Sequence, residues 1–105
     1  MYRVIGTNTY LDEISKWTKT DYEAAEKIPA KISANPFSGD SVGYKFFREQ
    51  RVREKRVYYL IYDDLKLILL IATSSKKDQQ SKINYIKHHL KDFRELADKI
   101  IKQGF

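Results

Sequence analysis

The stretch Arg51-Val52-Arg53-Glu54-Lys55-Arg56-Val57-Tyr58-Tyr59 predicts the tip of a β-hairpin that continues directly into an aromatic strand. If Arg53-Glu54 forms a two-residue turn, antiparallel pairing sets Arg51 opposite Arg56. Like charges that face each other across a strand pair repel, and further cations at positions 53 and 55 crowd the same tip. A fold that keeps this repulsion is expected to meet an anion there.

Composition limits the class of protein. The chain has 105 residues, of which 42% are apolar and 32% charged, so we expect one soluble globular domain over residues 1–105. Twenty Lys and Arg stand against fourteen Asp and Glu, which gives a net charge of +6. This balance favours polyanionic partners through electrostatic steering and counterion release. Nucleic acid is the first candidate and an acidic protein partner is the second.

Several kinds of site have no support in the sequence. There is no Cys, which excludes disulfides, thiolate metal sites and a cysteine nucleophile. No spacing of His, Asp or Glu suggests a metal site, so we predict no metal and no other cofactor. The apolar run after Met1-Tyr2-Arg3 is too short for a signal peptide, and no run has the length of a membrane span. We therefore expect a cytoplasmic protein without a membrane partner.

The N-terminal third predicts a strand followed by a helical hairpin. The short apolar run 2–6 favours a strand, and Asn8 or Thr9 is expected to cap the first helix. The tetrapeptide Thr20-Asp21-Tyr22-Glu23 is typical of a capping box, which would open the second helix. Pro29 is expected to kink or divide that helix because proline removes an amide donor and crowds the preceding turn.

The remainder predicts an antiparallel three-strand meander and a C-terminal helix. The strand-like runs are 44–52, 55–62 and 65–73, separated by Arg53-Glu54 and Asp63-Asp64. The last run lacks alternation, so we expect a central strand that is covered on both faces. Apolar residues at helical spacing then predict one long helix over about 81–103. The fold class is α+β, with the N-terminal strand and the meander joined in one twisted sheet.

This topology is expected to gather basic residues from separate segments. With two tight turns Arg56 pairs near Ile71, so the strand that ends at Thr73 leaves the sheet beside the Arg53-Glu54 turn. The cations expected to converge at this end of the sheet are Arg51, Arg53, Lys55, Arg56, Lys76 and Lys77. The free amides at the start of the last helix would also attract phosphate.

The same segments carry a resemblance to a known family. Arg51 to Tyr59 has the pattern Arg-Val-x-x-x-Arg-Val-x-Tyr across a strand, a tight turn and a second strand. Lys76-Lys77 follows the next strand, and Asn35-Pro36-Phe37 precedes a Gly-containing loop at the end of the helical hairpin. In this order and spacing the chain resembles, over nearly its whole length, the RelE/ParE superfamily of toxins from toxin–antitoxin pairs.

The resemblance implies a RelE-like ribonuclease that cuts messenger RNA on the ribosome and is neutralised by a cognate antitoxin. The implied chemistry needs no metal, because the RNA 2′-hydroxyl attacks the adjacent phosphorus. A base must then take the hydroxyl proton, cations must hold the charge of the phosphorane, and an acid may protonate the leaving oxygen. The expected partners are therefore an antitoxin protein and messenger RNA.

The resemblance also suggests residue roles. Arg51 and Arg56 match positions of the basic strand pair, and Arg56 is assigned to the charged phosphate because a guanidinium is permanently ionised and bidentate. Lys76 or Lys77 would act as base only if neighbouring cations favour loss of its proton. RelE nucleases carry a tyrosine shortly after their downstream arginine, and Tyr85 is the tyrosine of this chain that lies nearest to that position. The cations expected to contact RNA phosphates are Lys45, Arg48, Arg53 and Lys55.

Other interpretations of the chain stay open. Tyr85 falls within the last helix, and Lys76-Lys77 stands where the resemblance leads us to expect Arg. A ParE-like inhibitor of DNA gyrase and a non-catalytic module that binds RNA or the ribosome are therefore the alternatives. Cations near the turn also suit the protection of a strand pair against aggregation. The tyrosines of the second strand suit core packing better than base stacking, and His88 and His89 lie in mid-helix.

Overall fold

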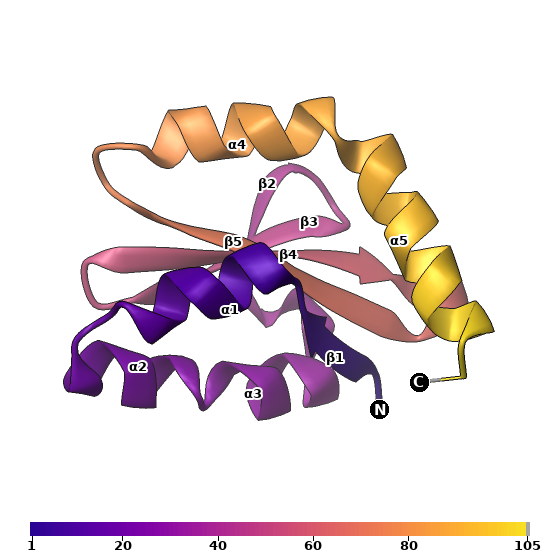
Figure 1. Ribbon diagram of the computed structural model, residues 1–105, viewed down its shortest axis with the longest axis horizontal. Helices are drawn as coiled ribbons and strands as arrows, with labels where there is room; N and C mark the ends of the chain where they lie inside the picture. The colour runs from indigo at the N-terminus through magenta and orange to yellow at the C-terminus, as the bar shows by residue number, and fades with distance from the viewer. Residues whose placement is uncertain (105) are drawn as a thin grey trace.

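The computed structural model describes residues 1–104 and contains one five-stranded sheet between two groups of helices (Figure 1). The strands are β1 (Arg3–Gly6), β2 (Asp40–Tyr44), β3 (Phe47–Val52), β4 (Lys55–Tyr62) and β5 (Leu67–Ser75). Their spatial order is β1-β5-β4-β3-β2, with β1 parallel to β5 and the other neighbours antiparallel. The expected α+β class with an N-terminal strand in the same sheet is confirmed.

Helices cover both faces of the sheet. On one side lie α1 (Asn8–Ser15), α2 (Lys19–Ala25) and α3 (Ile28–Ala34), and on the other lie α4 (Gln79–His88) and α5 (Leu90–Lys102) (Figure 1). The loop after α3 contains a short 3₁₀ helix, η1 (Pro36–Ser38), and a second one, η2 (Asp63–Leu65), lies between β4 and β5. The two groups of helices bury two separate apolar clusters against the sheet.

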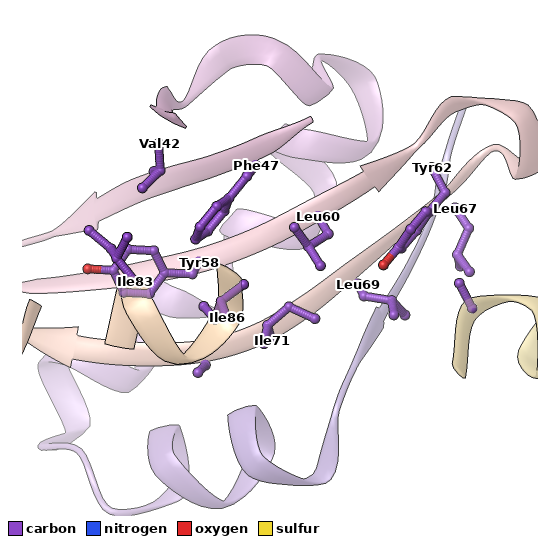
Figure 2. Packing of buried hydrophobic residues seen from close by; sticks show 12 residues of the cluster. Val42, Phe47, Tyr58, Leu60, Tyr62, Leu67, Leu69, Ile71, Ile83 and Ile86 are labelled. Carbon is purple, nitrogen blue, oxygen red and sulfur yellow. The ribbon is translucent and has the colours of Figure 1, made fainter. Parts of the chain in front are cut away.

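Strand alternation divides the core between these clusters. Val57, Tyr59 and Ile61 of β4 pack with α1 and α3, whereas Tyr58 and Leu60 pack with α4 and α5. Successive side chains of a strand point to opposite faces, so a strand covered on both sides is apolar along its length. Figure 2 shows the cluster beneath α4, with Ile83 beside Tyr58. The expectation that β5 is covered on both faces is confirmed, although β4 takes the central position.

The first two helices begin earlier in the chain than the sequence predicts. The first helix is capped by Thr7, whose side chain accepts a hydrogen bond from the amide of Tyr10 at 3.1 Å, and not by Asn8 or Thr9. The second is capped by Thr18, not by a Thr20 capping box. Each cap is the threonine at the last extended position before the helix begins.

Pro29 separates two helices, as expected. It lies in the first turn of α3, where proline is tolerated because its missing amide has no intrahelical partner there. The predicted long C-terminal helix is wrong in one respect, because it is broken at His89 between α4 and α5. The apolar stripe continues through the break, so the periodicity alone does not reveal it.

The meander has one strand more than predicted. Asp40–Tyr44 pairs with β3 as an edge strand, and this pairing is irregular between Ser41 and Tyr44. Gly43 has a φ of 87° in that segment, a left-handed conformation that suits glycine. A short edge strand with one buried residue, Val42, lacks the alternation by which strands are predicted.

The β4–β5 register differs from the prediction by three positions. Arg56 pairs with Ser74 instead of Ile71. The connection occupies Asp63 to Lys66 rather than two residues, and Lys66 adopts a φ of 50° to close it. The longer connection accounts for two of the three positions, and an irregularity in the pairing between Tyr58 and Tyr59 accounts for the third. The Arg53-Glu54 turn and the pairing of Arg51 with Arg56 are confirmed.

Tyr59 fastens the loop after α3 to the sheet. Its hydroxyl donates to the carbonyl of Pro36 at 2.7 Å and accepts from the amide of Gly39 at 3.2 Å. Gly39 allows the loop to approach this closely, since a Cβ there would lie 2.4 Å from the carbonyl oxygen of Glu49.

We expect Tyr59→Phe to lower the free energy of unfolding by about 1–3 kcal/mol, because it leaves the buried partners of the hydroxyl unpaired. Urea unfolding followed by circular dichroism measures this change. Tyr22→Phe is the matched control, because Tyr22 is exposed, and it should unfold like the wild type. Equal stability of both variants would show that the hydroxyl of Tyr59 contributes nothing.

Candidate functional site

A basic hollow of about 200 Å³ lies where the β3–β4 turn meets the end of β5. Its lining residues are Arg51, Arg53, Glu54, Arg56 and Lys76. The pairing of Lys55 with Ser75 brings the end of β5 to the turn, so that Lys76 follows directly beside it. The register of β3, β4 and β5 therefore brings Arg51, Arg56 and Lys76 together in one cationic surface. We call this site the basic hollow.

Arg56 is held by the carboxylate of Glu49, a residue that the sequence patterns did not indicate as part of the site. Its Nε lies 3.0 Å from Oε2 of Glu49, and the side chains are only 11% and 15% exposed. Burial raises the pKa of Glu49, although the charges of Arg56 and Arg51 oppose that shift. Since the carboxylate faces Nε, the terminal Nη groups of Arg56 remain for another acceptor.

Glu49 was predictable in part. Strand alternation puts Glu49 and Arg51 on the same face of β3, and the register sets Glu49 opposite Tyr58, the second residue after Arg56. The sequence alone therefore indicates that Glu49 and Arg56 are diagonal neighbours. What it does not show is that both side chains are largely buried.

The end of β5 is also fixed by side-chain bonds. The carboxylate of Asp78 accepts from the amide and the hydroxyl of Ser75 at 2.8 and 2.9 Å. Partial burial acts to raise the pKa of Asp78, but these bonds outweigh it and hold the pKa below its usual value. Ser74 bonds the hydroxyl of Tyr58 at 2.8 Å beneath the hollow. The segment that carries Lys76 therefore leaves the sheet at a defined point.

Some predicted site residues lie elsewhere. The expected convergence is wrong for Lys55, which points to the opposite face, with its Nζ 5.6 Å from the centroid of the Trp17 ring. Lys77 is exposed and does not line the basic hollow. Arg53 lines it but also pairs with Asp21 of α2, Nε to Oδ1, at 2.8 Å.

Lys45 and Arg48 lie toward the other end of β3. Both carry their charge over the ring of Phe37, at 5.4 and 5.2 Å from its centroid. Tyr85 is half exposed on α4 and stacks with His89 at a centroid distance of 4.4 Å, outside the lining of the basic hollow. The structure therefore separates Lys45, Arg48 and Tyr85 from Arg56.

The remaining candidates are structural. Tyr58, Tyr59 and Tyr62 are buried in the two apolar clusters, which confirms the packing interpretation. His88 and His89 each place Nδ1 within hydrogen-bond distance of a backbone carbonyl one turn earlier. Within residues 1–104 no three His, Asp or Glu side chains form a group that would hold a metal ion. None of the helices described is long and apolar enough to cross a bilayer.

Comparisons with known proteins identify the fold. No family model matches the chain, and no curated protein matches it. The isolated E. coli RelE toxin aligns with a TM-score of 0.63 and 16% identity over 82% of this chain and 99% of that one. A chain of the intact E. coli RelBE toxin–antitoxin complex gives 0.64 and 18%, over 71% of this chain and 96% of its own length.

The archaeal RelE–RelB complex from Pyrococcus horikoshii is similar in the same way. It gives a TM-score of 0.63 and 17% identity over 71% of this chain and 94% of that one. At such identities the likeness shows the fold, and it confirms the expected RelE-like architecture.

We expect Glu49→Gln to change the pH dependence of stability. Because burial raises the pKa of Glu49 above 4.5, the folded chain binds more protons than the unfolded chain between that value and the raised one. The contribution of Glu49 to the free energy of unfolding therefore falls as pH rises through this window. The stability of Glu49→Gln relative to wild type should improve between about pH 4 and pH 7 in urea unfolding.

Asp64→Asn is a control whose stability relative to wild type should change with pH in the opposite direction. Hydrogen bonds from Arg94 hold the pKa of Asp64 below its usual value. The stability that Asp64 contributes is thus present above its unfolded pKa and is lost as pH falls through the folded pKa. Relative to wild type, Asp64→Asn should become less stable as pH rises. A shift of Glu49→Gln in that same direction would refute the description of Glu49 as a desolvated carboxylate.

Proposed function

We propose that this chain, which has the RelE fold, is the toxin of a toxin–antitoxin pair and cleaves messenger RNA at the basic hollow. The observation that carries the proposal is the convergence of Arg51, Arg56 and Lys76 in one hollow of that fold. The proposal treats residues 1–105 as a single toxin domain in the cytoplasm. The RelE chains to which it is similar include partners in toxin–antitoxin complexes.

The hollow suits a phosphodiester. Arginine offers planar, bidentate donors that match phosphate oxygens. Arg51 and Arg56 face each other across the strand pair, so their mutual repulsion is relieved when an anion lies between them. A bound phosphate thus turns an unfavourable pairing into a favourable one.

The proposed reaction is attack of the RNA 2′-oxygen on the adjacent phosphorus. As the new P–O2′ bond forms, the hydroxyl proton passes to a base, and we assign this proton transfer to Lys76 in its neutral form because it lines the hollow. Arg51 and Arg56 stabilise the added negative charge on the equatorial oxygens. The P–O5′ bond then breaks, and the 5′-oxygen takes a proton from lysine or water. The products are a 2′,3′-cyclic phosphate and a 5′-hydroxyl end.

Glu49 is a positioning residue in this scheme. Its carboxylate engages Nε of Arg56 at 3.0 Å, which fixes the direction of the guanidinium while its Nη groups serve the phosphate. An arginine that is already oriented loses less conformational entropy when it binds the transition state. A glutamate beside the phosphate also weakens the binding of the anion in the ground state, where tight binding would not accelerate the reaction.

The small volume of the basic hollow supports a reaction that depends on the ribosome. It provides cations for a phosphate, but a volume of about 200 Å³ leaves little room to grip the flanking nucleotides. In-line attack requires the 2′-oxygen, the phosphorus and the leaving oxygen to be aligned. Messenger RNA that is already held on the ribosome would supply this alignment.

The proposed antitoxin is a small protein with an acidic or amphipathic segment. The net charge of +6 and the basic hollow favour an acidic partner. Both outer strands of the sheet, β1 and β2, have one neighbour each, so an added strand is a second mode of attachment. A segment that lies across the basic hollow would neutralise the toxin by covering its cations.

We expect Arg56→Ala to reduce the cleavage rate by about 100-fold or more, because it removes a donor to the charged phosphorane. Cleavage is measured on a translated messenger RNA with and without ribosomes, together with growth after induction. Arg3→Ala is the charge-matched control, since Arg3 is exposed and pairs with Leu67 at the far end of β5 from Ser74. Its activity should equal that of the wild type.

Equal toxicity of Arg56→Ala and the wild type would refute the role of Arg56. Growth unaffected by the wild type, together with salt-sensitive binding of RNA, would favour the non-catalytic RNA-binding module. Supercoiling defects and DNA breaks in place of RNA cleavage would favour the gyrase inhibitor.

A further inference from the structure

A strip of exposed aromatic rings crosses the hairpin formed by β2 and β3. Tyr44 and Phe46 stack at a centroid distance of 5.0 Å and an interplanar angle of 20°. Tyr44, Phe46 and Phe37 are 45%, 38% and 38% exposed, respectively. Exposed rings that stack on each other present flat apolar faces that the core does not use. We call Phe37, Tyr44 and Phe46 the aromatic strip.

Cations lie over two of these rings. Nζ of Lys87, from α4, is 5.8 Å from the centroid of Tyr44. Lys45 and Arg48 lie over Phe37, as described above. The strip is therefore flanked by positive charge from the β2–β3 hairpin and from α4.

These cations lack carboxylate partners. Among the ion pairs of residues 1–104, none involves Lys45, Arg48 or Lys87. Arg48 donates one long hydrogen bond, from Nη2 to the carbonyl of Phe37 at 3.4 Å, and its buried Nε has no partner in the described part of the chain. An incoming anion would supply acceptors that the fold itself does not provide.

Phe37 and Phe46 also form two walls of a hollow of about 360 Å³, which Lys45, Ile61 and Asp63 complete. Asp63 is the acidic group on this rim, and its carboxylate is engaged by the hydroxyl of Tyr2 and by Nζ of Lys66. Its charge is therefore largely compensated from outside the hollow. A largely apolar hollow, lined by Phe37 and Phe46 with Lys45 as its cation, therefore remains for a flat ligand that carries negative charge.

We propose that the aromatic strip is a second RNA-contact site, in which an unpaired base stacks on Phe37 or Phe46 while Lys45 and Arg48 hold its phosphates. This inference rests on the proposed action on RNA. Stacking on exposed rings combined with a basic rim is how proteins bind single strands with little sequence preference. Phe46 lies directly before β3, and Arg51 follows five positions later, roughly 17 Å at the rise of an extended strand, so the stacked base lies outside the basic hollow.

The test measures binding separately from cleavage. A fluorescein-labelled ten-nucleotide oligouridylate is titrated with protein at several salt concentrations, and fluorescence anisotropy gives the dissociation constant. Phe46→Leu and Phe37→Leu keep an apolar side chain but remove the aromatic face, whereas Phe46→Tyr keeps it. We expect each leucine variant to bind about 5- to 100-fold more weakly and Phe46→Tyr to bind like the wild type. Lys45→Ala should reduce the salt dependence by about one phosphate contact.

Several outcomes distinguish this inference from the proposed function. If both leucine variants bind RNA like the wild type while Arg51→Ala binds weakly, the second site is refuted and the basic hollow stands. If the wild type does not bind the oligonucleotide and does not cleave RNA on ribosomes, the proposed function itself fails. Leucine variants that keep RNA binding but no longer bind an acidic protein partner would assign the strip to that partner instead. Thermal unfolding midpoints equal to the wild type verify that each variant is folded.

Discussion

The double burial of β4 is the constraint on which the rest of the structure depends. Its side chains must alternate between two apolar clusters, so a slip of one residue would move every one of them to the wrong layer. The register of β3 and β5 against β4 is thereby fixed. This register also determines which side chains meet where the strands end, and it places Arg56 between Arg51 and Ser74. The geometry of the basic hollow is thus a consequence of how the core packs.

The Glu49–Arg56 pair is difficult to explain by stability alone. Taking two charges out of water costs several kcal/mol per ion before their attraction is counted, and an apolar pair of similar volume is often as stable or more stable. Burial raises the pKa of Glu49 although the charge of Arg56 acts to lower it. The cost becomes intelligible if the chain needs a guanidinium of fixed orientation at that point. Charges that the fold tolerates but does not require are where function is best sought.

Sequence patterns predicted the elements and the basic hairpin tip well, because these features are local. The period of the apolar residues, the Arg53-Glu54 turn and the division at Pro29 each depend on neighbours within a few positions. The errors arose where tertiary structure decides. A four-residue connection and a bulge shifted Arg56 from Ile71 to Ser74, and an edge strand with one buried residue gave no alternation at all. Glu49 was missed because its importance comes from burial, which a sequence does not display.

The rigidity of β3 gives the two cationic surfaces a defined relation. The basic hollow takes Arg51 from the end of this strand, whereas Arg48, nearer its start and on the opposite face, lies over Phe37 of the aromatic strip. A strand within a sheet cannot shorten, so the distance of roughly 17 Å along the chain from Phe46 to Arg51 is set mainly by the extended backbone of β3. If both surfaces bind RNA, a mononucleotide would occupy one at a time, whereas an extended strand that engaged both would gain the advantage of linked binding. Preference for a longer RNA would then follow from the length of a strand, without any contact that reads the identity of a base.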